Sequence, residues 1–382
     1  MGYSVATGFP SGSGARYGST VQAQRPTLDP NPPELFGVMP DGTPIHRIVL
    51  NSGIRVAILT YGAAIQSIEV PDRDGCVADV VLGLNTLADY IAYSPHFGAV
   101  PGRYAGRIRD AHFDLDGVTY DLPRNDGRNT LHGGPDGFGK RAWRLVAYSP
   151  AHVDLALTSP DGDAGFPGTL DVRLRYTVDQ TTLGIQITAT TDRATVLNLT
   201  NHAYFNLNGE GSGGIDDHEL TIHARRAMHI GPDAMPTGAL CPVAGTPLDF
   251  TTPRTIGSRL RSGHPQMLRA RGYDHAFLLD GTGLRPAARL VSHASGRTLD
   301  VLTTQPALQL YTGNTLTGAY AGHSGRSYRP GDAVCLEAQH LPDSPNHPHF
   351  PSTVLRPNET FRATIQFRFG VLSAPAQADA QP

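Results

Sequence analysis

Apolar and polar residues alternate with a period of two along several long stretches of the chain. The segment LDVRLRYTV at 170–178 places an apolar or aromatic residue at every second position, and FRATIQFRF at 361–369 alternates almost without interruption. Residues 54–70 and 183–190 follow the same pattern. Successive side chains of a strand point to opposite faces of the sheet, so this alternation predicts half-buried β-strands.

Turn residues separate these alternating segments. FDLDGVTYDL at 113–122 alternates on both sides of an Asp-Gly pair, which is favoured at the centre of a tight hairpin turn. Helical periodicity is nearly absent, and only 87–93 predicts a short helix. The 43 glycines and 31 prolines are typical of the many turns of an all-β protein.

Composition divides the chain into a long central part and two tails. Residues 1–33 are rich in Gly, Ser and Pro, which predicts a disordered N-terminal tail, and 372–382 predict a flexible C-terminal tail. No compositional break or fixed-period repeat divides 34–371. We therefore predict an all-β fold, a single large antiparallel β-sandwich over 34–371, with two stacked β domains as the alternative.

Charge and cysteine content narrow the classes of partner. The net charge of −3 gives no electrostatic basis for binding nucleic acid or an anionic membrane surface. Cys76, Cys241 and Cys335 are far apart and odd in number, which argues against a disulfide framework. Neither an apolar run of transmembrane length nor a secretory signal pattern is visible. We expect a cytoplasmic protein, with a periplasmic location as the alternative.

Two local patterns suggest metal or nucleotide binding but lack essential parts. HLPDSPNHPHF contains three histidines, yet zinc ligands must be held rigidly and this stretch is a proline-rich loop, so we expect surface histidines. GPDGFGK at 134–140 nearly matches a phosphate-binding loop, but Arg141 stands where Ser or Thr would bind magnesium. We therefore expect no metal and no cofactor.

A dispersed set of polar residues lies in or beside apolar, strand-like segments. The set comprises Arg103, Arg107, His132, His202, Asp274, Gln309 and Glu337. Each one alone also fits a structural role, such as an arginine paired with a carboxylate. Together, carboxylates, imidazoles, guanidinium groups and an amide match the donors and acceptors of a polyhydroxylated ligand. TNHAYFNLNG at 200–209 adds further amides directly after an alternating strand, which indicates a polar ligand there as well.

Eight segments, in order, resemble the aldose 1-epimerase (galactose mutarotase) family, and the resemblance runs from about residue 37 to 371. They are TYGAAIQSIEVPDRDG, FGAVPGRYAGRI, LHGGPDGFGKRAW, NHAYFNLNG, PTGAL with GTPLDF, GYDHAFLL, LQLYTGN and LEAQHLPDSPN. The resemblance implies a large antiparallel β-sandwich. It also implies an enzyme that interconverts the α and β anomers of free aldoses.

The resemblance assigns roles to individual residues. It implies that Glu337 is the catalytic base and that His202 is the acid, pointing at the ring oxygen from a polar cluster that lines the sugar pocket. The implied sugar-binding residues are Arg107, His132, Asp274 and Gln309, with Tyr204 beside them. Many members have Asn before the arginine of this motif, whereas this chain has Gly106, so the preferred sugar stays open.

Anomer interconversion needs only a paired acid and base, because the C1 hydroxyl loses a proton while the ring oxygen gains one. Reference pKa values of about 4.3 for Glu and about 6.5 for His predict a bell-shaped optimum in mildly acidic solution. We expect Arg107 to lower the pKa of both Glu337 and His202, whereas a nearby carboxylate would raise that of His202.

Other functions remain open at this stage. A glycosidase would use two carboxylates, which Asp274 and Glu337 could supply, but it would leave the histidines idle. A hexose-phosphate mutarotase would need a further cationic pocket, to which Arg141 or Arg144 could contribute. A non-catalytic sugar-binding protein would tolerate loss of the acid and base. The expected partner is a small-molecule aldose, bound by a monomer or homodimer.

Overall fold

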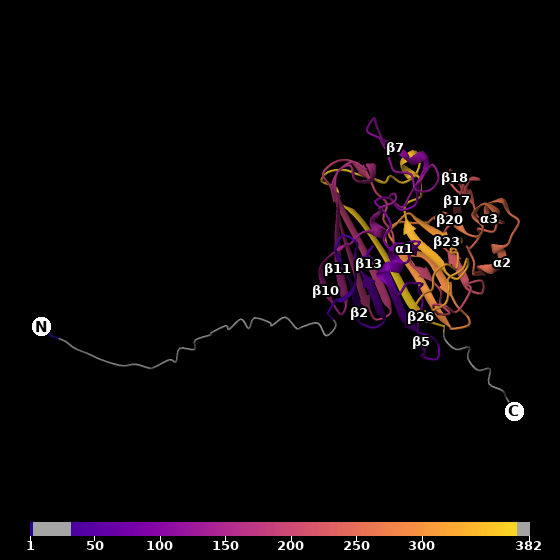
Figure 1. Cartoon of the computed structure of the whole chain (residues 1–382), viewed down its shortest axis with the longest axis horizontal. Helices are drawn as coiled ribbons and strands as arrows, with labels where there is room; N and C mark the ends of the chain where they lie inside the picture. The colour runs from indigo at the N-terminus through magenta and orange to yellow at the C-terminus, as the bar shows by residue number, and fades with distance from the viewer. Residues whose placement is uncertain (3–31, 373–382) are drawn as a thin grey trace, which may run out of the picture. The chain divides into compact units, whose positions relative to one another are not determined.

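The computed structural model describes residues 1–2 and 32–372. Antiparallel strands dominate this part of the chain, which confirms the predicted all-β fold (Figure 1). The tails predicted at 1–33 and 372–382 lie almost entirely outside the described residues, so they stay predictions. No helix among the described residues is long and apolar enough to cross a membrane.

The largest sheet has nine strands in the order β10-β11-β12-β13-β26-β22-β21-β16-β19. Their bounds are β10 Arg144–Ser149, β11 His152–Ser159, β12 Leu170–Asp179, β13 Thr182–Thr191, β26 Phe361–Val371, β22 Arg297–Thr303, β21 Arg285–Val291, β16 Glu219–Ile222 and β19 Arg254–Thr255. In Figure 1, β11, β13 and β26 lie on one side of the described fold, and β20 and β23 lie on the other.

Two further sheets have six and five strands. The six-stranded sheet has the order β15-β24-β23-β20-β17-β18, and the five-stranded sheet runs from β1 to β5 in sequence order. Their bounds are β15 Tyr204–Phe205, β24 Val334–Gln339, β23 Ala307–Tyr311, β20 Asp274–Leu278, β17 Arg226–Ile230, β18 Pro236–Pro242, β1 Glu34–Val38, β2 Pro44–Asn51, β3 Arg55–Leu59, β4 Ile65–Pro71 and β5 Val77–Asp79. An isolated antiparallel bridge joins Val81, two residues after β5, to Phe205 of β15.

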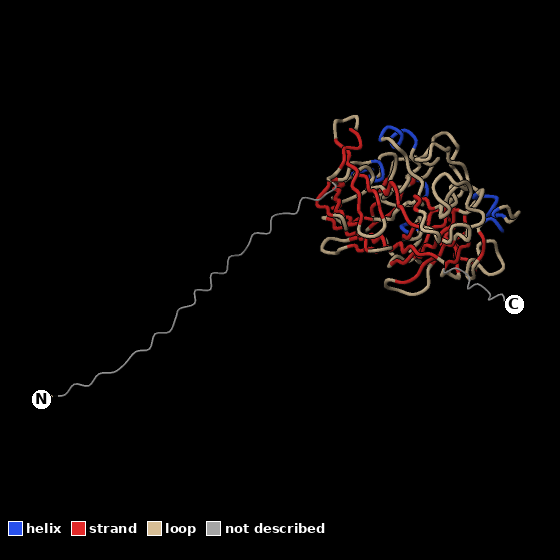
Figure 2. Tube along the Cα trace, turned by 90° about the horizontal axis from the view of Figure 1, so that it is seen from below, coloured by secondary structure: helices blue, strands red, loops and turns tan. Residues whose placement is uncertain are grey.

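Short strand pairs and helices complete the described fold, and Figure 2 shows how little of it is helical. The pairs are β6 Arg107–Ile108 with β9 Thr130–Leu131, β7 His112–Leu115 with β8 Val118–Asp121, and β14 Thr195–Val196 with β25 Val354–Leu355. The helices are α1 Leu87–Tyr93, α2 Gly257–Leu260 and α3 Pro265–Ala270. The hairpin and the helix predicted from the sequence are thus confirmed as β7–β8 and α1.

Local sequence explains these two elements. The hairpin turn places Asp116 at φ 52° and Gly117 at φ 79°, a left-handed conformation that Asp and Gly adopt more readily than other residues. Helix α1 begins after Thr86, whose hydroxyl oxygen accepts a hydrogen bond from the backbone N–H of Asp89. This contact satisfies one of the free N–H groups at the helix start.

Side chains of β23 and β24 alternate between the hydrophobic core and the opposite face of the sheet. Leu308 and Leu310 of β23 and Leu336 of β24 belong to the main hydrophobic core, together with residues of the nine-stranded and five-stranded sheets. Gln309 and Glu337 lie at the intervening positions, directly opposite each other across the two strands. At these positions the six-stranded sheet therefore presents polar side chains on the side away from the core.

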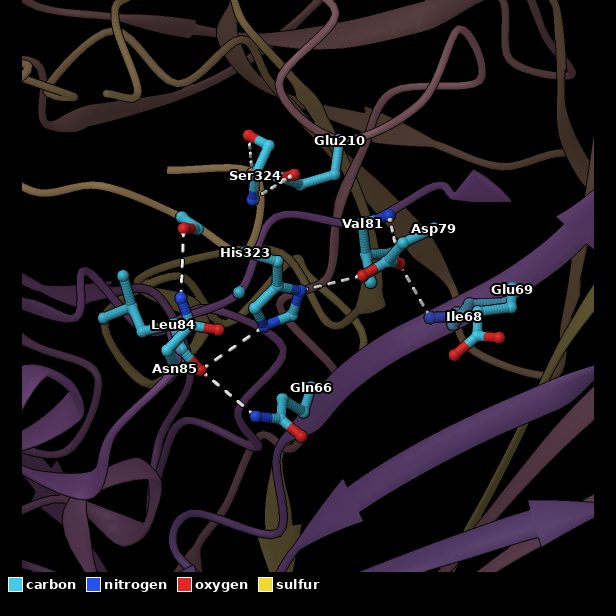
Figure 3. A network of polar contacts seen from close by, with 12 residues as sticks. Gln66, Ile68, Glu69, Asp79, Val81, Leu84, Asn85, Glu210, His323 and Ser324 are labelled. Atoms are coloured by element: carbon cyan, nitrogen blue, oxygen red, sulfur yellow. Dashed lines mark hydrogen bonds and ion pairs between the residues drawn. The ribbon is translucent and has the colours of Figure 1, made fainter. Parts of the chain in front are cut away.

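A polar network ties a loop to β5 (Figure 3). His323 Nδ1 lies 2.9 Å from Asp79 Oδ2, and its Nε2 lies 3.3 Å from the Leu84 carbonyl oxygen. The other Asp79 oxygen accepts hydrogen bonds from the backbone N–H groups of Ile68 and Val81. Burial alone would lower the pKa of His323, but its hydrogen bond to Asp79 and the charge of that carboxylate raise it. The network therefore stabilises the loop that follows β23.

Candidate active site

The face of the six-stranded sheet that carries Gln309 and Glu337 lines a cavity of about 290 Å³. Polar and apolar side chains line it together. The polar residues include His96, Arg107, His132, His202, Asp274, Gln309, Glu337 and Gln339, and the apolar residues include Met228, Ile230, Ala234 and Pro236. Such a mixed lining suits a sugar ring, which carries both hydroxyl groups and C–H faces.

All seven residues implied by the family resemblance line this one cavity. Asp274, Gln309 and Glu337 stand on the adjacent strands β20, β23 and β24, where sheet register holds their backbones side by side. Arg107 belongs to β6, and His132 follows β9, the strand that pairs with β6. The remaining residues lie at or just before β15; they are His202 and Tyr204.

Arg107 sits at the centre of a charge network. Its Nε donates to Asp126 Oδ2 at 2.7 Å, and its Nη1 donates to Asp274 Oδ2 at 3.5 Å. The other oxygen of Asp274 accepts a hydrogen bond from Gln309 Nε2 at 2.6 Å. Burial would lower the pKa of Arg107, but Asp274 and Asp126 raise it. The network fixes the Asp274 carboxylate at the cavity wall, where it can accept hydrogen bonds from hydroxyl groups.

His132 is held in one orientation by the backbone. Its Nδ1 accepts a hydrogen bond from the N–H of Gly106 at 3.2 Å. Burial is the main reason that the pKa of His132 lies well below its ordinary value, and the neighbouring histidines His96 and His202 lower it further. The ring is therefore neutral at pH 7 with its proton on Nε2, so it can donate one hydrogen bond.

His202 and Glu337 form a deeply buried pair of titratable groups in the cavity. His202 Nε2 lies 3.6 Å from Glu337 Oε1, and both side chains are more than nine-tenths buried. The His202 ring stacks on Tyr204, with ring centroids 5.0 Å apart. The Tyr204 hydroxyl donates to the Pro95 carbonyl oxygen at 2.9 Å, so its ring acts as a support for His202.

Burial shifts the pKa values of this pair in opposite directions. The pKa of His202 falls to about 3 because burial disfavours its charged form, with a further contribution from His96. The pKa of Glu337 rises well above its ordinary value through burial and the charge of Asp274, which outweigh the opposing effect of Arg107. Arg107 does lower the pKa of Glu337, as expected, but the expectation of a net decrease is wrong, because burial and Asp274 have the larger effect.

Most of the polar cluster at 200–209 does not reach the cavity. The Asn201 amide donates to the Gly98 carbonyl oxygen, and that of Asn206 donates to the carbonyl oxygens of Gly213 and Asp332. These amides hold neighbouring loops through backbone hydrogen bonds that a buried loop requires. The expectation that the whole cluster lines the pocket is wrong, because only His202 and Tyr204 of this segment do so.

Arg103 is also structural. It is 1% exposed, and its guanidinium donates to the carbonyl oxygens of Pro167 and Gly168 and to the hydroxyl groups of Ser159 and Thr195. It therefore bonds to protein groups away from the cavity, as a buried charge must.

The histidines of the proline-rich loop also depart from expectation in part. His340 and His347 are partly buried, and His347 Nε2 lies 3.2 Å from Asp343 Oδ2. His349 is exposed. The expectation of three surface histidines is therefore correct only for His349.

The structure adds cavity residues that the sequence did not indicate. His96 lies with its ring centroid 4.7 Å from that of His132, and Gln339 lies two residues after Glu337 on the same face of β24. Period-two spacing from Glu337 could have found Gln339. His96 gives no comparable signal, because it lies in a loop, between Pro95 and Phe97, outside any alternating strand.

Comparison with known proteins agrees with this fold. The aldose 1-epimerase family model matches residues 46–368. The chain is 42% identical to the galactose mutarotase of Bos taurus over 340 residues, which cover 88% of this chain and 98% of the bovine protein. It is 39% identical to the aldose 1-epimerase of Escherichia coli over 343 residues, with the same coverage of both chains.

Solved structures show the same architecture. The galactose 1-epimerase of Lactobacillus acidophilus aligns with a TM-score of 0.79 at 30% identity, covering 90% of this chain and all of that one. The GalM/aldose epimerase homologue of C. elegans also aligns with a TM-score of 0.79, at 29% identity, covering 86% of this chain and all of that one. With the match over residues 46–368, these likenesses show that the chain belongs to the aldose 1-epimerase family.

Proposed function

We propose that the protein is an isomerase that interconverts the α and β anomers of free aldoses by acid and base catalysis. The observation that carries this proposal is the buried pair of His202 and Glu337, 3.6 Å apart, in a cavity lined by hydroxyl-binding groups. Relatives named galactose mutarotase and aldose 1-epimerase support it. Glu337 is the base and His202 the acid.

At pH values between the pKa of His202 and that of Glu337, the pair carries one proton. In the form that reacts, Glu337 is a carboxylate and His202 is an imidazolium. Glu337 takes the proton of the C1 hydroxyl while His202 gives its proton to the ring oxygen, and the C1–O bond to the ring breaks. The open aldehyde turns about the C1–C2 bond. The former ring oxygen then attacks the other face of C1, returning its proton to His202, while Glu337 returns a proton to the C1 oxygen. Both groups end as they began.

The surrounding groups orient the sugar. Asp274, fixed by Arg107 and Gln309, accepts hydrogen bonds from ring hydroxyl groups. His132 donates from Nε2 and, with Arg107, stabilises charge that develops on the ring oxygen. Such preorganised donors act strongly in a site from which water is excluded.

Charge balance favours a free aldose over a sugar phosphate. Among the described residues that line the cavity, Arg107 is the one Arg or Lys, and two carboxylates already pair with it. Arg141 instead forms two hydrogen bonds with Asp163. Arg144 lies exposed on β10. No second cation therefore reaches the cavity from these positions to bind a phosphate.

The same proposal covers location and assembly. Cys76, Cys241 and Cys335 are free thiols, which suits a reducing compartment, so we place the enzyme in the cytoplasm. We propose that it acts on a small-molecule aldose as a monomer or homodimer.

Anomer-exchange NMR of the purified protein in EDTA tests the proposal. We expect faster exchange than in buffer for at least one of glucose, galactose, xylose and arabinose, and a smaller effect on glucose 6-phosphate. An exchange rate equal to that in buffer for every sugar would contradict the enzymatic function. Sugar binding without exchange would favour a non-catalytic sugar-binding protein.

A further inference from the structure

Gln339 occupies a position from which it reaches the cavity beside the acid and base. It is the last residue of β24, two residues after Glu337, and residues two apart in a strand share a face. Its side chain is 1% exposed and lines the cavity. Ala307 stands directly opposite on β23 and offers only a methyl group, so it provides no hydrogen-bond partner for the Gln339 amide.

The amide of Gln339 has unused hydrogen-bonding capacity. Its Oε1 is buried and has no hydrogen-bond partner among the described residues. Leaving a buried amide unpaired costs free energy, so buried amides in proteins are nearly always satisfied. Gln66, a buried glutamine outside this cavity, follows that rule, because it accepts from Arg47 and donates to the Leu84 carbonyl oxygen.

Gly106 leaves space next to this amide. Gly106 and Gln339 both line the cavity, and a Cβ added to Gly106 would lie 3.7 Å from Gln339 Nε2. The φ of Gly106 is +80°, a conformation that Asn tolerates better than most side chains. A side chain at this position would lie beside Gln339 Nε2 and against Pro342, whose Cβ would be 3.3 Å from the added Cβ.

From these observations, we propose that Gln339 is a further substrate-binding residue whose amide forms hydrogen bonds with a sugar hydroxyl across the space left by Gly106. The inference rests on the proposed function and extends it. Two residues of a strand span about 6.6 Å, so the hydroxyl that Gln339 binds is not the C1 hydroxyl that reacts with Glu337. Gln339 thereby contributes to the choice among aldoses that differ in hydroxyl arrangement.

The test combines substitutions with sugar analogues. Gln339→Ala should raise KM roughly tenfold, as expected for the loss of about two hydrogen bonds, with a much smaller change in kcat. With the deoxy sugar that lacks the contacted hydroxyl, the same substitution should change KM less than twofold. Gln66→Ala, the matched control, removes a buried amide that is already paired within the protein and should leave KM unchanged (Figure 3).

Gly106→Asn provides a second, independent variant. Its amide would fill the space beside Gln339, so Gln339→Ala in this background should change KM less than it does alone. If the two effects on KM simply multiply, the proposed coupling through the Gly106 space is wrong. If Gln339→Ala alone leaves KM within twofold for every aldose exchanged, the proposal is overturned.

A crystal structure of the unmodified protein with its best aldose keeps the proposal testable if the variants fail to fold. A sugar hydroxyl within hydrogen-bond distance of the Gln339 amide supports it, and a bound sugar without that contact overturns it. Failure of this inference can be distinguished from failure of the proposed function. Sugar binding that depends on Gln339 without anomer exchange would refute the enzymatic function alone, whereas exchange with no dependence on Gln339 would refute only this inference.

Discussion

The rings of His96, His132 and His202 lie close together at the cavity, with centroid separations of 4.7, 5.4 and 6.0 Å. Burial lowers the pKa of each, to about 4 for His96 and about 3 for His202. Three imidazolium groups could not coexist at these separations in a buried site. The cluster is therefore neutral at rest, and in the proposed mechanism His202 becomes charged only when it receives the proton that the pair shares with Glu337.

The pH dependence of catalysis should reflect this shared proton. A second proton is bound only near the lowered pKa of His202, about 3, and the last proton is lost only above the raised pKa of Glu337. We therefore expect kcat/KM to stay level down to about pH 4, because the number of protons on the His202–Glu337 pair does not change in that range. A bell-shaped profile with limbs near about 4.3 and 6.5 would contradict the lowered pKa of His202 and the raised pKa of Glu337. Near-UV circular dichroism at each pH checks that the protein is folded.

Removal of the Asp274 carboxylate should weaken sugar binding. A hydrogen bond between a hydroxyl and a carboxylate typically contributes about 1.5–3 kcal/mol, so Asp274→Ala should raise the dissociation constant roughly ten- to a hundredfold. Titration calorimetry measures this change. Asp300→Ala, which removes a surface carboxylate paired with Arg289, serves as a control and should leave the affinity unchanged. Equal affinities for Asp274→Ala and the unmodified protein would remove Asp274 from the site.

A site residue could be predicted from the sequence when a family motif assigned it a role. The segment LEAQHLPDSPN located Glu337 through the family resemblance, whereas Gln339 in the same segment received no role, because its unpaired amide appears only in three dimensions. Asn201 and Arg103 looked functional, because a sequence does not show which carbonyl oxygens lie nearby. Polar residues in loops are therefore the hardest to classify from sequence.

At the scale of a single strand, β23 shows how one element serves two functions. Leu310 is fully buried in the core, and Gln309 beside it lines the cavity. Leu310→Ala should lower the free energy of unfolding by about 2–5 kcal/mol, since it leaves a cavity in a packed core. Gln309→Ala should change stability by at most about 1.5 kcal/mol but should raise KM. Urea denaturation and initial rates distinguish the two effects, and equal destabilisation by both would contradict the two-faced strand.

Individual strands were more predictable than their arrangement. The alternation at 170–178 and 361–369 located β12 and β26 within two residues at each end, because each has one face in the core. Sheet order was not predictable, since β26 pairs with β13 and β22, which are far away in sequence. The short helices α2 and α3 were missed, because four and six residues are too few for a helical pattern to appear.

At the scale of the whole molecule, buried neutral histidines make stability sensitive to acid. His275 is fully buried, and burial lowers its pKa to about 3, as it does for His202. A histidine whose folded pKa is depressed contributes its full stability above the unfolded value of about 6.5 and loses it as pH falls toward the folded value. Each one contributes a slope of up to about 1.4 kcal/mol per pH unit in that window.

We therefore expect the free energy of unfolding to fall steadily between pH 6.5 and pH 4. His275→Asn keeps an acceptor for the backbone N–H of Asp274 but removes one titrating group, so its stability should fall less steeply over the same range. Urea unfolding at several pH values measures both slopes. Parallel curves for the variant and the unmodified protein would show that His275 does not contribute to the acid sensitivity.

The most direct test of the proposed mechanism is the anomer-exchange rate of Glu337→Gln, measured with sugar affinity across pH. Gln keeps the shape of the side chain but cannot accept the C1 proton, so exchange should fall by about 10²- to 10⁴-fold while sugar binding persists. Glu69→Gln, the same change outside the cavity, should exchange at the unmodified rate. An exchange rate of Glu337→Gln within a few-fold of the unmodified protein would mean that another group is the base, and would contradict the mechanism.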